Sequence, residues 1–137
     1  MSTHGLSGAV VRPLHGLLLA FPIALFIFAL FTDIAYLKTA EVQWTNFSAW
    51  LITGALVFGG LAGVFSILDF IFGRSRRALI HVIALALAWM LGLVNAFKHS
   101  QDAWSSVGAF GLILSILCTI LVLVAGWTAY AARESVR

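Results

Sequence analysis

The segment 107–132 reads VGAFGLILSILCTILVLVAGWTAYAA and contains no charged residue. A helix of about 20 apolar residues crosses the hydrocarbon core of a bilayer, and this segment exceeds that length. Three further apolar runs, at 14–36, 47–72 and 78–97, reach or exceed it too. None of the runs alternates apolar and polar residues as the strands of a membrane β-barrel do. We therefore predict an all-α membrane protein with four transmembrane helices.

The composition of the 137-residue chain points to lipid as its solvent. Hydrophobic residues make up 62% of the chain and charged residues 9%, whereas soluble domains carry about 25% charged residues. The formal charge of +3 comes from short clusters between the apolar runs, which is typical of loops at a membrane surface and not of a nucleic-acid interface. We expect residues 1–137 to form a single transmembrane domain in contact with lipid, with no nucleic-acid partner.

The links between the runs are short, at 38–46, 73–77 and 98–106. Short links make consecutive helices antiparallel neighbours, which predicts an up-down-up-down bundle. Six arginines fall at the chain ends and in the middle link, whereas the other side has only Lys38 and Lys98. By the positive-inside rule, both termini and the middle link are then cytoplasmic. The six arginines are Arg12, Arg74, Arg76, Arg77, Arg133 and Arg137.

Small residues form stripes on two of the predicted helices. Ala55, Gly59 and Gly63 follow one another at four-residue spacing, and Gly111 and Ser115 repeat this pattern in the last run. Small residues on one stripe let two helix backbones approach closely. We interpret both stripes as packing surfaces inside the bundle, and self-association through the second helix is the alternative.

Ionisable side chains are costly within a membrane, so each one in a span is a candidate functional residue. His15, Asp69 and His81 each lie about one turn inside the nearest arginine. A rise of about 1.5 Å per residue therefore places them at nearly the same depth. Thr128 and Tyr130 of the last run reach the same level. The sequence predicts one membrane-buried layer of two histidines, one carboxylate and two hydroxyl groups.

A second group of polar residues lies toward the lysine-bearing side. Asp33 is five helical turns after His15, and His99 is five turns after His81, so the members of each pair share a helix face. Asn95 lies near that face of the third helix. We expect these faces to point into the bundle, away from lipid. Asp33 itself is interpreted as a helix-end residue at the membrane interface.

His15 and His81 stand on the first and third helices, which lie diagonally in a four-helix bundle. Bundle cores commonly hold cofactors, and two axial imidazoles with a nearby arginine suit the iron and the propionates of a b-type haem. We therefore predict haem b between His15 and His81 as iron ligands, with Arg77 near the propionates. Supporting polar roles are predicted for Asp69, Asp33, Asn95 and Tyr130.

Two other interpretations of the same layer stay open. A hydrogen bond from His15 or His81 to Asp69 would hold the bundle together without any cofactor, and the same residues would suit a metal ion or a proton path. The sequence shows no nucleophile–base set, glycine-rich phosphate loop or zinc signature. We expect a protein that is not an enzyme on its own.

The stretch LHGLLLAFPIAL at 14–25, followed by Asp33, resembles the opening of a bacterial membrane-protein family catalogued as domain of unknown function 2231. That family continues with a glycine-rich helix ending in aspartate, here Asp69, and with a histidine opening the third helix, here His81. The resemblance runs from about residue 12 to residue 95. It implies a four-helix protein of the bacterial inner membrane, and some relatives are associated with redox proteins.

The sequence departs from the family pattern at two positions. Gly16 replaces the usual proline, and Ala20 stands where many members have a second histidine. Any role that needs this second histidine is therefore in doubt here.

These features predict a small integral membrane subunit that binds one b-type haem between the first and third helices and exchanges electrons with a partner. The first alternative is a non-catalytic anchor or assembly subunit whose buried histidine and aspartate layer is structural. The second alternative is a proton or ion path. The expected partner is another membrane or redox protein subunit, or a second copy of the chain.

Overall fold

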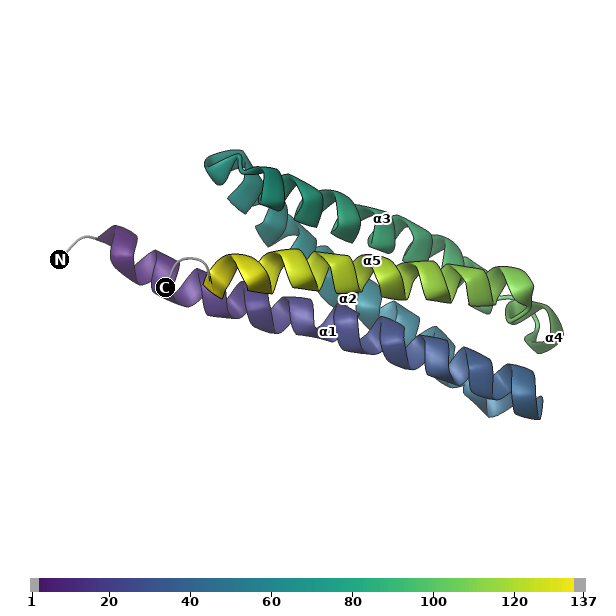
Figure 1. Cartoon of the computed structure of the whole chain (residues 1–137). Helices are drawn as coiled ribbons and strands as arrows, with labels where there is room; N and C mark the ends of the chain where they lie inside the picture. Colours follow the sequence, from purple (N-terminus) through teal and green to yellow (C-terminus); the bar gives the residue numbers. More distant parts are fainter. Residues whose placement is uncertain (1–2, 135–137) are drawn as a thin grey trace.

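The computed structural model describes the backbone of residues 3–134 and the side chains of residues 10–102 and 105–131. Four long helices and one short turn make up the fold, and the described residues contain no strand. The prediction of an all-α protein with four long helices is confirmed. The helices are α1 (Thr3–Thr39), α2 (Val42–Gly73), α3 (Arg76–His99), the one-turn α4 (Ala103–Ser106) and α5 (Ala109–Glu134) (Figure 1).

Consecutive long helices run antiparallel and pack side by side. The neighbouring pairs are α1 with α2, α2 with α3, α3 with α5, and α5 with α1, so α1 and α3 lie on one diagonal of the bundle. The beginning of α1, the α2–α3 connection and the end of α5 gather at one end (Figure 1). The predicted up-down-up-down topology is therefore confirmed.

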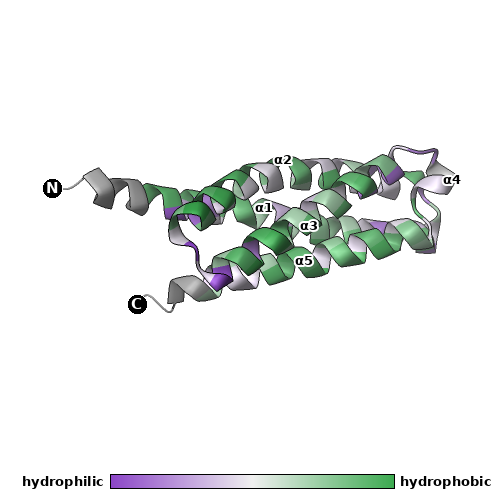
Figure 2. Cartoon of the chain, turned by 90° about the horizontal axis from the view of Figure 1, so that it is seen from above, coloured by the Kyte–Doolittle hydropathy of each residue, from purple (hydrophilic) through white to green (hydrophobic). Residues whose placement is uncertain are grey.

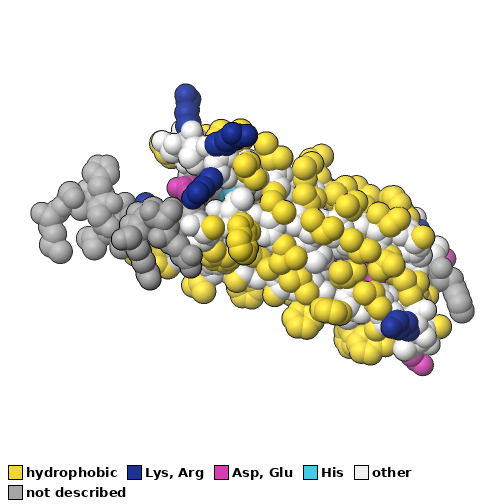
Figure 3. All heavy atoms as spheres, viewed as in Figure 1, with side chains coloured by type: hydrophobic (Ala, Val, Ile, Leu, Met, Phe, Trp, Pro, Cys, Tyr) yellow, Lys and Arg dark blue, Asp and Glu magenta, His cyan; other side chains and the backbone are white. Residues whose placement is uncertain are grey.

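Four helical stretches are long and apolar enough to cross a membrane, namely Val10–Thr39, Val42–Gly73, Arg76–His99 and Ala109–Ala131. Hydrophobic side chains cover most of the face of the bundle seen in Figure 3, and charged side chains lie toward its two ends. The ribbon is mostly hydrophobic along the middle of the long helices (Figure 2). So large an apolar exterior is suited to lipid and not to water.

The charged residues distinguish the two ends of the bundle. Arg74, Arg76 and Arg77 surround the α2–α3 connection, with Arg12 near the start of α1 at the same end. We call this the arginine end. The opposite end carries Lys38 and Lys98, together with Glu41 and Asp102, and we call it the lysine end. The side chains of Arg133 and Arg137 lie outside the described residues.

The links between helices are shorter than the sequence predicts. Only Ala40 and Glu41 join α1 to α2, because α2 begins at Val42 instead of residue 47. Thr45, which falls in the predicted loop, is buried and bonds Ser106 at 2.9 Å. This inward contact accounts for the extra helical turn. The link predicted at 98–106 contains the turn α4.

Both two-residue links between long helices begin with a left-handed residue. Ala40 has a φ of 57° and donates its N–H to the carbonyl of Tyr36 at 2.8 Å. Arg74 has a φ of 43° and donates to Phe70 at 2.8 Å. Such a residue closes the open carbonyls at a helix end and reverses the chain. Ser75 then caps α3, because its Oγ accepts the N–H of Ala78 at 3.0 Å.

Helix α2 turns a stripe of mostly small residues toward its neighbours. The buried positions recur at alternating spacings of three and four residues, the period of a helix packed in a bundle. Ala55 and Gly59 lie on this stripe as predicted, but Gly63 lies only half-buried beside it. The prediction for Gly63 is therefore wrong. The buried positions of α2 are Thr45, Ser48, Ile52, Ala55, Gly59, Ala62 and Ser66.

Apolar side chains fill the middle of the bundle. Packing there is tight, since a Cβ atom added to Gly92 of α3 would stand 2.6 Å from Cζ of Phe26 on α1. This apolar middle separates the polar groups at one end of the bundle from those at the other. Its buried members include Leu19, Phe26, Ala29, Ile52, Ala62, Leu85, Ala88 and Val122.

Candidate functional site

Near the arginine end, side chains from three helices meet at one hydroxyl group. Nε2 of His15 on α1 and Nε2 of His81 on α3 each lie 2.8 Å from Oγ of Ser66 on α2. Nδ1 of His81 lies 2.8 Å from the backbone carbonyl of Ala125 on α5. We call His15, Ser66, His81 and this carbonyl the arginine-side layer, and it joins all four long helices.

The two imidazole rings of this layer are in contact across the diagonal of the bundle. Their centroids are 5.5 Å apart, and the rings meet edge to face at 85°. His81 is 6% exposed, whereas His15 is half-buried. The convergence of the two histidines at one depth agrees with the sequence analysis.

The prediction of a buried carboxylate in this layer is wrong. Asp69 is exposed, since it lies on the last part of α2, beyond the packed region that ends at Ser66. Arg77 is exposed as well. Tyr130 donates its hydroxyl to the carbonyl of Gly16 at 3.0 Å and so links α5 to α1 beside His15. Thr128 bonds only carbonyls of its own helix among the contacts described for it.

Ser66 is the side chain of the arginine-side layer that sequence reasoning missed. It occupies the place assigned to Asp69, three residues earlier in the chain. The signal that identifies it is the alternating spacing of three and four residues that runs from Ile52 through Ala55, Gly59 and Ala62. When this alternating spacing is extended beyond Ala62, in place of a constant spacing of four residues, the next inward position is Ser66.

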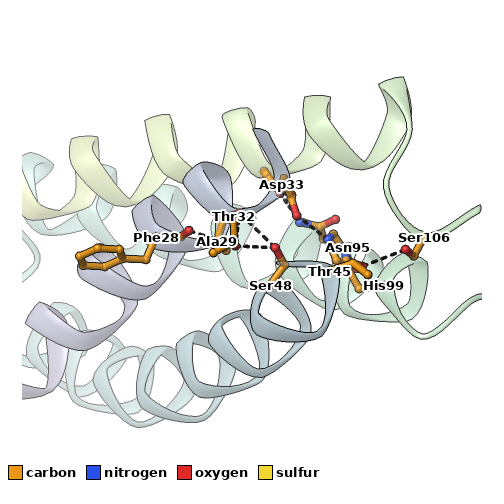
Figure 4. A network of polar contacts seen from close by, with 10 residues as sticks. Phe28, Ala29, Thr32, Asp33, Thr45, Ser48, Asn95, His99 and Ser106 are labelled. Carbon is orange, nitrogen blue, oxygen red and sulfur yellow. Dashed lines mark hydrogen bonds and ion pairs between the residues drawn. The ribbon is translucent and has the colours of Figure 1, made fainter. Parts of the chain in front are cut away.

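At the lysine end, Asp33 of α1 is 0% exposed and contacts two other helices. Its Oδ1 lies 2.8 Å from Nε2 of His99 on α3, and its Oδ2 accepts a hydrogen bond from the hydroxyl of Ser115 on α5. Nδ1 of His99 lies 2.9 Å from the carbonyl of Asn95. Nδ2 of Asn95 donates to Oγ of Ser115 at 2.9 Å. We call these four residues the lysine-side layer, part of which Figure 4 shows.

The interpretation of Asp33 as a helix-end residue at the interface is wrong. Helix α1 continues past Asp33 to Thr39, so Asp33 does not lie at the end of its helix. Its carboxylate points into the bundle toward α3 and α5. The physical reason is that Asp33 lies on the same inward stripe as Phe26 and Ala29, both of which are buried. Asn95 and His99 are buried, as the shared helix face predicts.

Hydroxyl groups bring α2 into this end of the bundle. Ser48 bonds the hydroxyl of Thr32 and donates to the carbonyl of Ala29 at 3.3 Å, while Thr45 bonds Ser106 at 2.9 Å (Figure 4). Oδ1 of Asn95 is the one buried side-chain oxygen or nitrogen for which the described residues offer no partner. The lysine end is therefore tied to all four long helices, as the arginine end is.

A cavity of about 270 Å³ opens between α2 and α3 next to Ser66. Its walls are apolar, with Gly59, Gly60 and Gly63 on one side and Trp89 on the other. The indole of Trp89 donates to the carbonyl of Leu56 at 2.9 Å. The cavity is smaller than the 300–1,000 Å³, roughly, of most small-molecule sites.

The residues of the arginine-side layer, as arranged, do not fit a haem. An iron held by both histidines would need each Nε2 about 2 Å away from it, yet Oγ of Ser66 occupies the point on which both nitrogens converge. The imidazole rings contact each other directly, which leaves no flat gap for a porphyrin between them. Haem binding and the role of Arg77 stay predictions, and this arrangement of side chains argues against them.

The described residues also contain no group of three or more histidine, cysteine, aspartate or glutamate side chains placed to hold a metal ion. Cys118 is buried in the apolar middle, where its Sγ lies 3.7 Å from the carbonyl of Ala88. What the two layers offer chemically is hydrogen bonding and proton exchange between imidazole, hydroxyl and carboxylate groups.

The fold and its site define a class of protein: a four-helix integral membrane bundle with a buried polar layer toward each end. The chain belongs to the family of predicted membrane proteins known as DUF2231, whose family model matches residues 11–132. The match confirms the resemblance found in the sequence. No curated protein and no solved structure matches the chain.

Proposed function

We propose that this protein is a non-catalytic subunit of a membrane assembly, in which the two polar layers hold the four helices in one fixed arrangement. The observation that supports this most is that each end of the bundle has hydrogen bonds to α1, α2, α3 and α5. Both ring nitrogens of His81 and of His99 already have partners within the chain.

Polar contacts have a particular value in this setting. Lipid is as apolar as a leucine side chain, so burial of apolar groups does little to hold transmembrane helices together. Hydrogen bonds between helices contribute about 0.6 kcal/mol each on average, and small residues add close packing. Layers at both ends fix the depth of each helix relative to its neighbours. A rigid bundle of this kind suits an anchor or an assembly subunit.

The orientation in the membrane is part of the proposal. Arg12, Arg74, Arg76 and Arg77 at one end outweigh Lys38 and Lys98 at the other. The positive-inside rule then places the arginine end in the cytoplasm of a bacterium, with the bundle in the inner membrane. The partner is another membrane or redox subunit, or a second copy of the chain.

The test is to cross-link the tagged full-length protein within its native membrane and then to determine its mass and stoichiometry in mild detergent. We expect a complex of defined stoichiometry, with itself or with one membrane protein, and no visible pigment. A protein that stays a monomer under these conditions would overturn the subunit proposal.

An absorbance spectrum of the same preparation tests the haem prediction, whose one favourable observation is the convergence of the two Nε2 atoms. With ample haem supply during growth, a Soret band that disappears in His81→Ala would replace the structural proposal by an electron-carrier function. The matched control is Thr128→Ala, which lies at a similar depth outside the layer.

A further inference from the structure

The hydroxyl of Ser66 has more neighbours than it can donate to. His15 Nε2 and His81 Nε2 lie 2.8 Å from it, and the carbonyl oxygen of Ala62 lies 2.7 Å away. A serine hydroxyl has one hydrogen to donate and two lone pairs that accept. One of the three neighbours therefore receives the hydrogen, and a histidine nitrogen that does not receive it is placed to donate to Ser66. A carbonyl only accepts. The ring nitrogens that carry hydrogens in the two histidines therefore decide which neighbour receives the hydroxyl hydrogen of Ser66.

The carbonyl of Ala125 fixes one of these positions. Nδ1 of His81 lies 2.8 Å from that oxygen, so Nδ1 carries a hydrogen. When His81 is neutral, its Nε2 is then a lone pair and must accept the hydrogen of Ser66. His15 completes the set by donating from its own Nε2 to Oγ of Ser66. The result is a chain of hydrogen bonds that runs in one direction, from His15 through Ser66 to His81.

The same heavy-atom positions accommodate one more proton. If Nε2 of His81 is protonated while His15 keeps its hydrogen on Nε2, both imidazoles donate to Ser66, and the hydroxyl hydrogen turns toward the carbonyl of Ala62. Only a hydroxyl hydrogen rotates, and no bond to a buried group is lost. The carbonyl of Ala62 thus provides the position that the hydrogen occupies in the charged state.

We propose that His15, Ser66 and His81 form a proton relay, which takes up a proton at the arginine end through His15 and holds it on His81. In the transfer step, the Nε2–H bond of a protonated His15 breaks as that proton joins Oγ of Ser66. The original O–H bond of Ser66 breaks in the same step, and its proton joins Nε2 of His81. His15 is left neutral with its hydrogen on Nδ1, its Nε2 accepts the new hydroxyl hydrogen of Ser66, and the positive charge has moved to His81.

Burial decides from which side protons reach the relay, and it also opposes the positive charge on His81. His15 is half-buried near the arginine end, whereas His81 is 6% exposed and lies behind it. Beyond His81, toward the lysine end, the described interior is lined by apolar side chains such as Leu85 and Ala88. Protons therefore enter and leave from one side, which makes the relay a proton-binding site and not a channel. The inference stands apart from the subunit role proposed above.

The charged groups around the relay come from α1, α2 and α3, and α5 adds one neutral hydroxyl. From α2, the exposed carboxylate of Asp69 attracts a positive charge on His81 and so offsets part of the cost of burying that charge. Arg12 on α1 precedes His15 by three residues, and Arg77 on α3 precedes His81 by four. The positive charge of each arginine therefore disfavours a positive charge on the histidine near it. From α5, Tyr130 presents a neutral hydroxyl that bonds the α1 backbone. Among the described residues, Asp69 is thus the one acidic side chain that stabilises a positive charge on His81.

The test is nitrogen NMR of the histidine side chains in the full chain, reconstituted in lipid nanodiscs and titrated with acid. At high pH we expect His81 to be neutral with its hydrogen on Nδ1. On acidification we expect Nε2 of His81 to gain a proton, with His15 and His81 titrating as a coupled pair. A neutral His81 with its hydrogen on Nε2, or a His81 that never gains a proton while the protein stays folded, would overturn the proposal.

Two variants separate the relay from simple burial. In Ser66→Ala, proton exchange at His81 should slow by about tenfold or more, the factor expected when one hydrogen bond of the route is lost. The matched control is Ser48→Ala, since Ser48 is also a buried serine of α2 but bonds no histidine.

His15→Gln provides an independent test, in case Ser66→Ala fails to fold. Its amide still donates a hydrogen bond to Ser66 but carries no transferable proton, so we expect the same slowing with an unchanged helical spectrum. Exchange at His81 that is as fast in His15→Gln as in the parent chain would refute entry through His15.

Discussion

At the scale of single residues, Asp33 shows how strongly a buried polar group depends on its partners. Nδ1 of His99 faces a carbonyl and so carries a hydrogen, while Oδ2 of Asp33 accepts the hydroxyl of Ser115. One proton must then lie between Oδ1 and Nε2, because two lone pairs facing each other at 2.8 Å would repel. The Asp33–His99 pair is therefore neutral overall.

This proton count leads to a prediction for two substitutions at one position. Asp33→Asn keeps every contact, because the new amide donates to Nε2 of His99 and its oxygen accepts from Ser115. We expect it to change the free energy of unfolding by less than about 1 kcal/mol. Asp33→Ala leaves both partners unpaired in the interior and should lower that free energy by about 3 kcal/mol.

Unfolding of the purified variants in mixed micelles by a denaturing detergent measures both values. The control is Asp69→Ala, an exposed aspartate that should change the stability by no more than about 0.5 kcal/mol. Equal losses in Asp33→Asn and Asp33→Ala would show that the charge of Asp33, and not its hydrogen bonds, stabilises the bundle.

At the scale of helices, the spacing of small residues decides which faces meet. A Cβ atom on Gly92 of α3 would lie 2.6 Å from Phe26 and 3.2 Å from Leu56, whereas one on Gly63 of α2 would meet nothing within 4 Å. We expect Gly92→Ala to destabilise the protein by about 1–3 kcal/mol through overpacking. Gly63→Ala should be neutral, or stabilising by up to about 1 kcal/mol through helix propensity.

The same unfolding titration measures this pair of variants, and the two alanines serve as controls for each other. A loss in Gly63→Ala as large as that in Gly92→Ala would mean that the face of Gly63 packs against something, such as a partner helix. Such a result would also direct the cross-linking experiment toward the α2–α3 cavity.

The helices themselves are well predicted from the sequence, and the partners of their polar residues are not. Length and apolarity are local properties, so all four spans and their order follow from the chain alone. The partner of Asp33 depends on how far α1 is rotated and shifted relative to α3 and α5, and His99 and Ser115 are distant in sequence. Depth alone therefore placed Asp33 at the interface and Asp69 in the interior, and both placements were wrong.

The link between α1 and α2 was mispredicted for a related reason. Residues 42–46 contain three polar side chains, which is typical of a loop. They nevertheless continue the helix, because Thr45 turns inward and bonds Ser106 of α4, which is 61 residues further along the chain. A tertiary contact of this kind overrides the local composition.

At the scale of the whole molecule, the two charged ends define a topology that labelling can test. Cys118, the single cysteine, is buried in the apolar middle and should not react with a membrane-impermeant maleimide. Gly73→Cys and Gln101→Cys place thiols at exposed positions on opposite ends. We expect Gln101→Cys to react in intact cells and Gly73→Cys only after the cytoplasmic side is opened.

The unmodified chain, with Cys118 alone, is the background control for this experiment. Labelling of both variants from the same side would contradict the antiparallel bundle. Labelling from opposite sides in the reverse sense would preserve the bundle and refute only the cytoplasmic placement of the arginine end.

The two-residue connections also constrain how the chain is made. Two extended residues reach only about 7 Å, far less than the roughly 30 Å of hydrocarbon that each helix crosses. Helices joined by such a link must therefore cross the bilayer in opposite directions, with the link at one membrane surface. A nascent chain that has completed α2 but not α3 holds Ser66 in lipid without His81. The hydrogen bonds of each polar layer are thus complete only when α5 has been inserted. Until then, unpaired polar groups distinguish an unfinished chain from a complete one for membrane quality control.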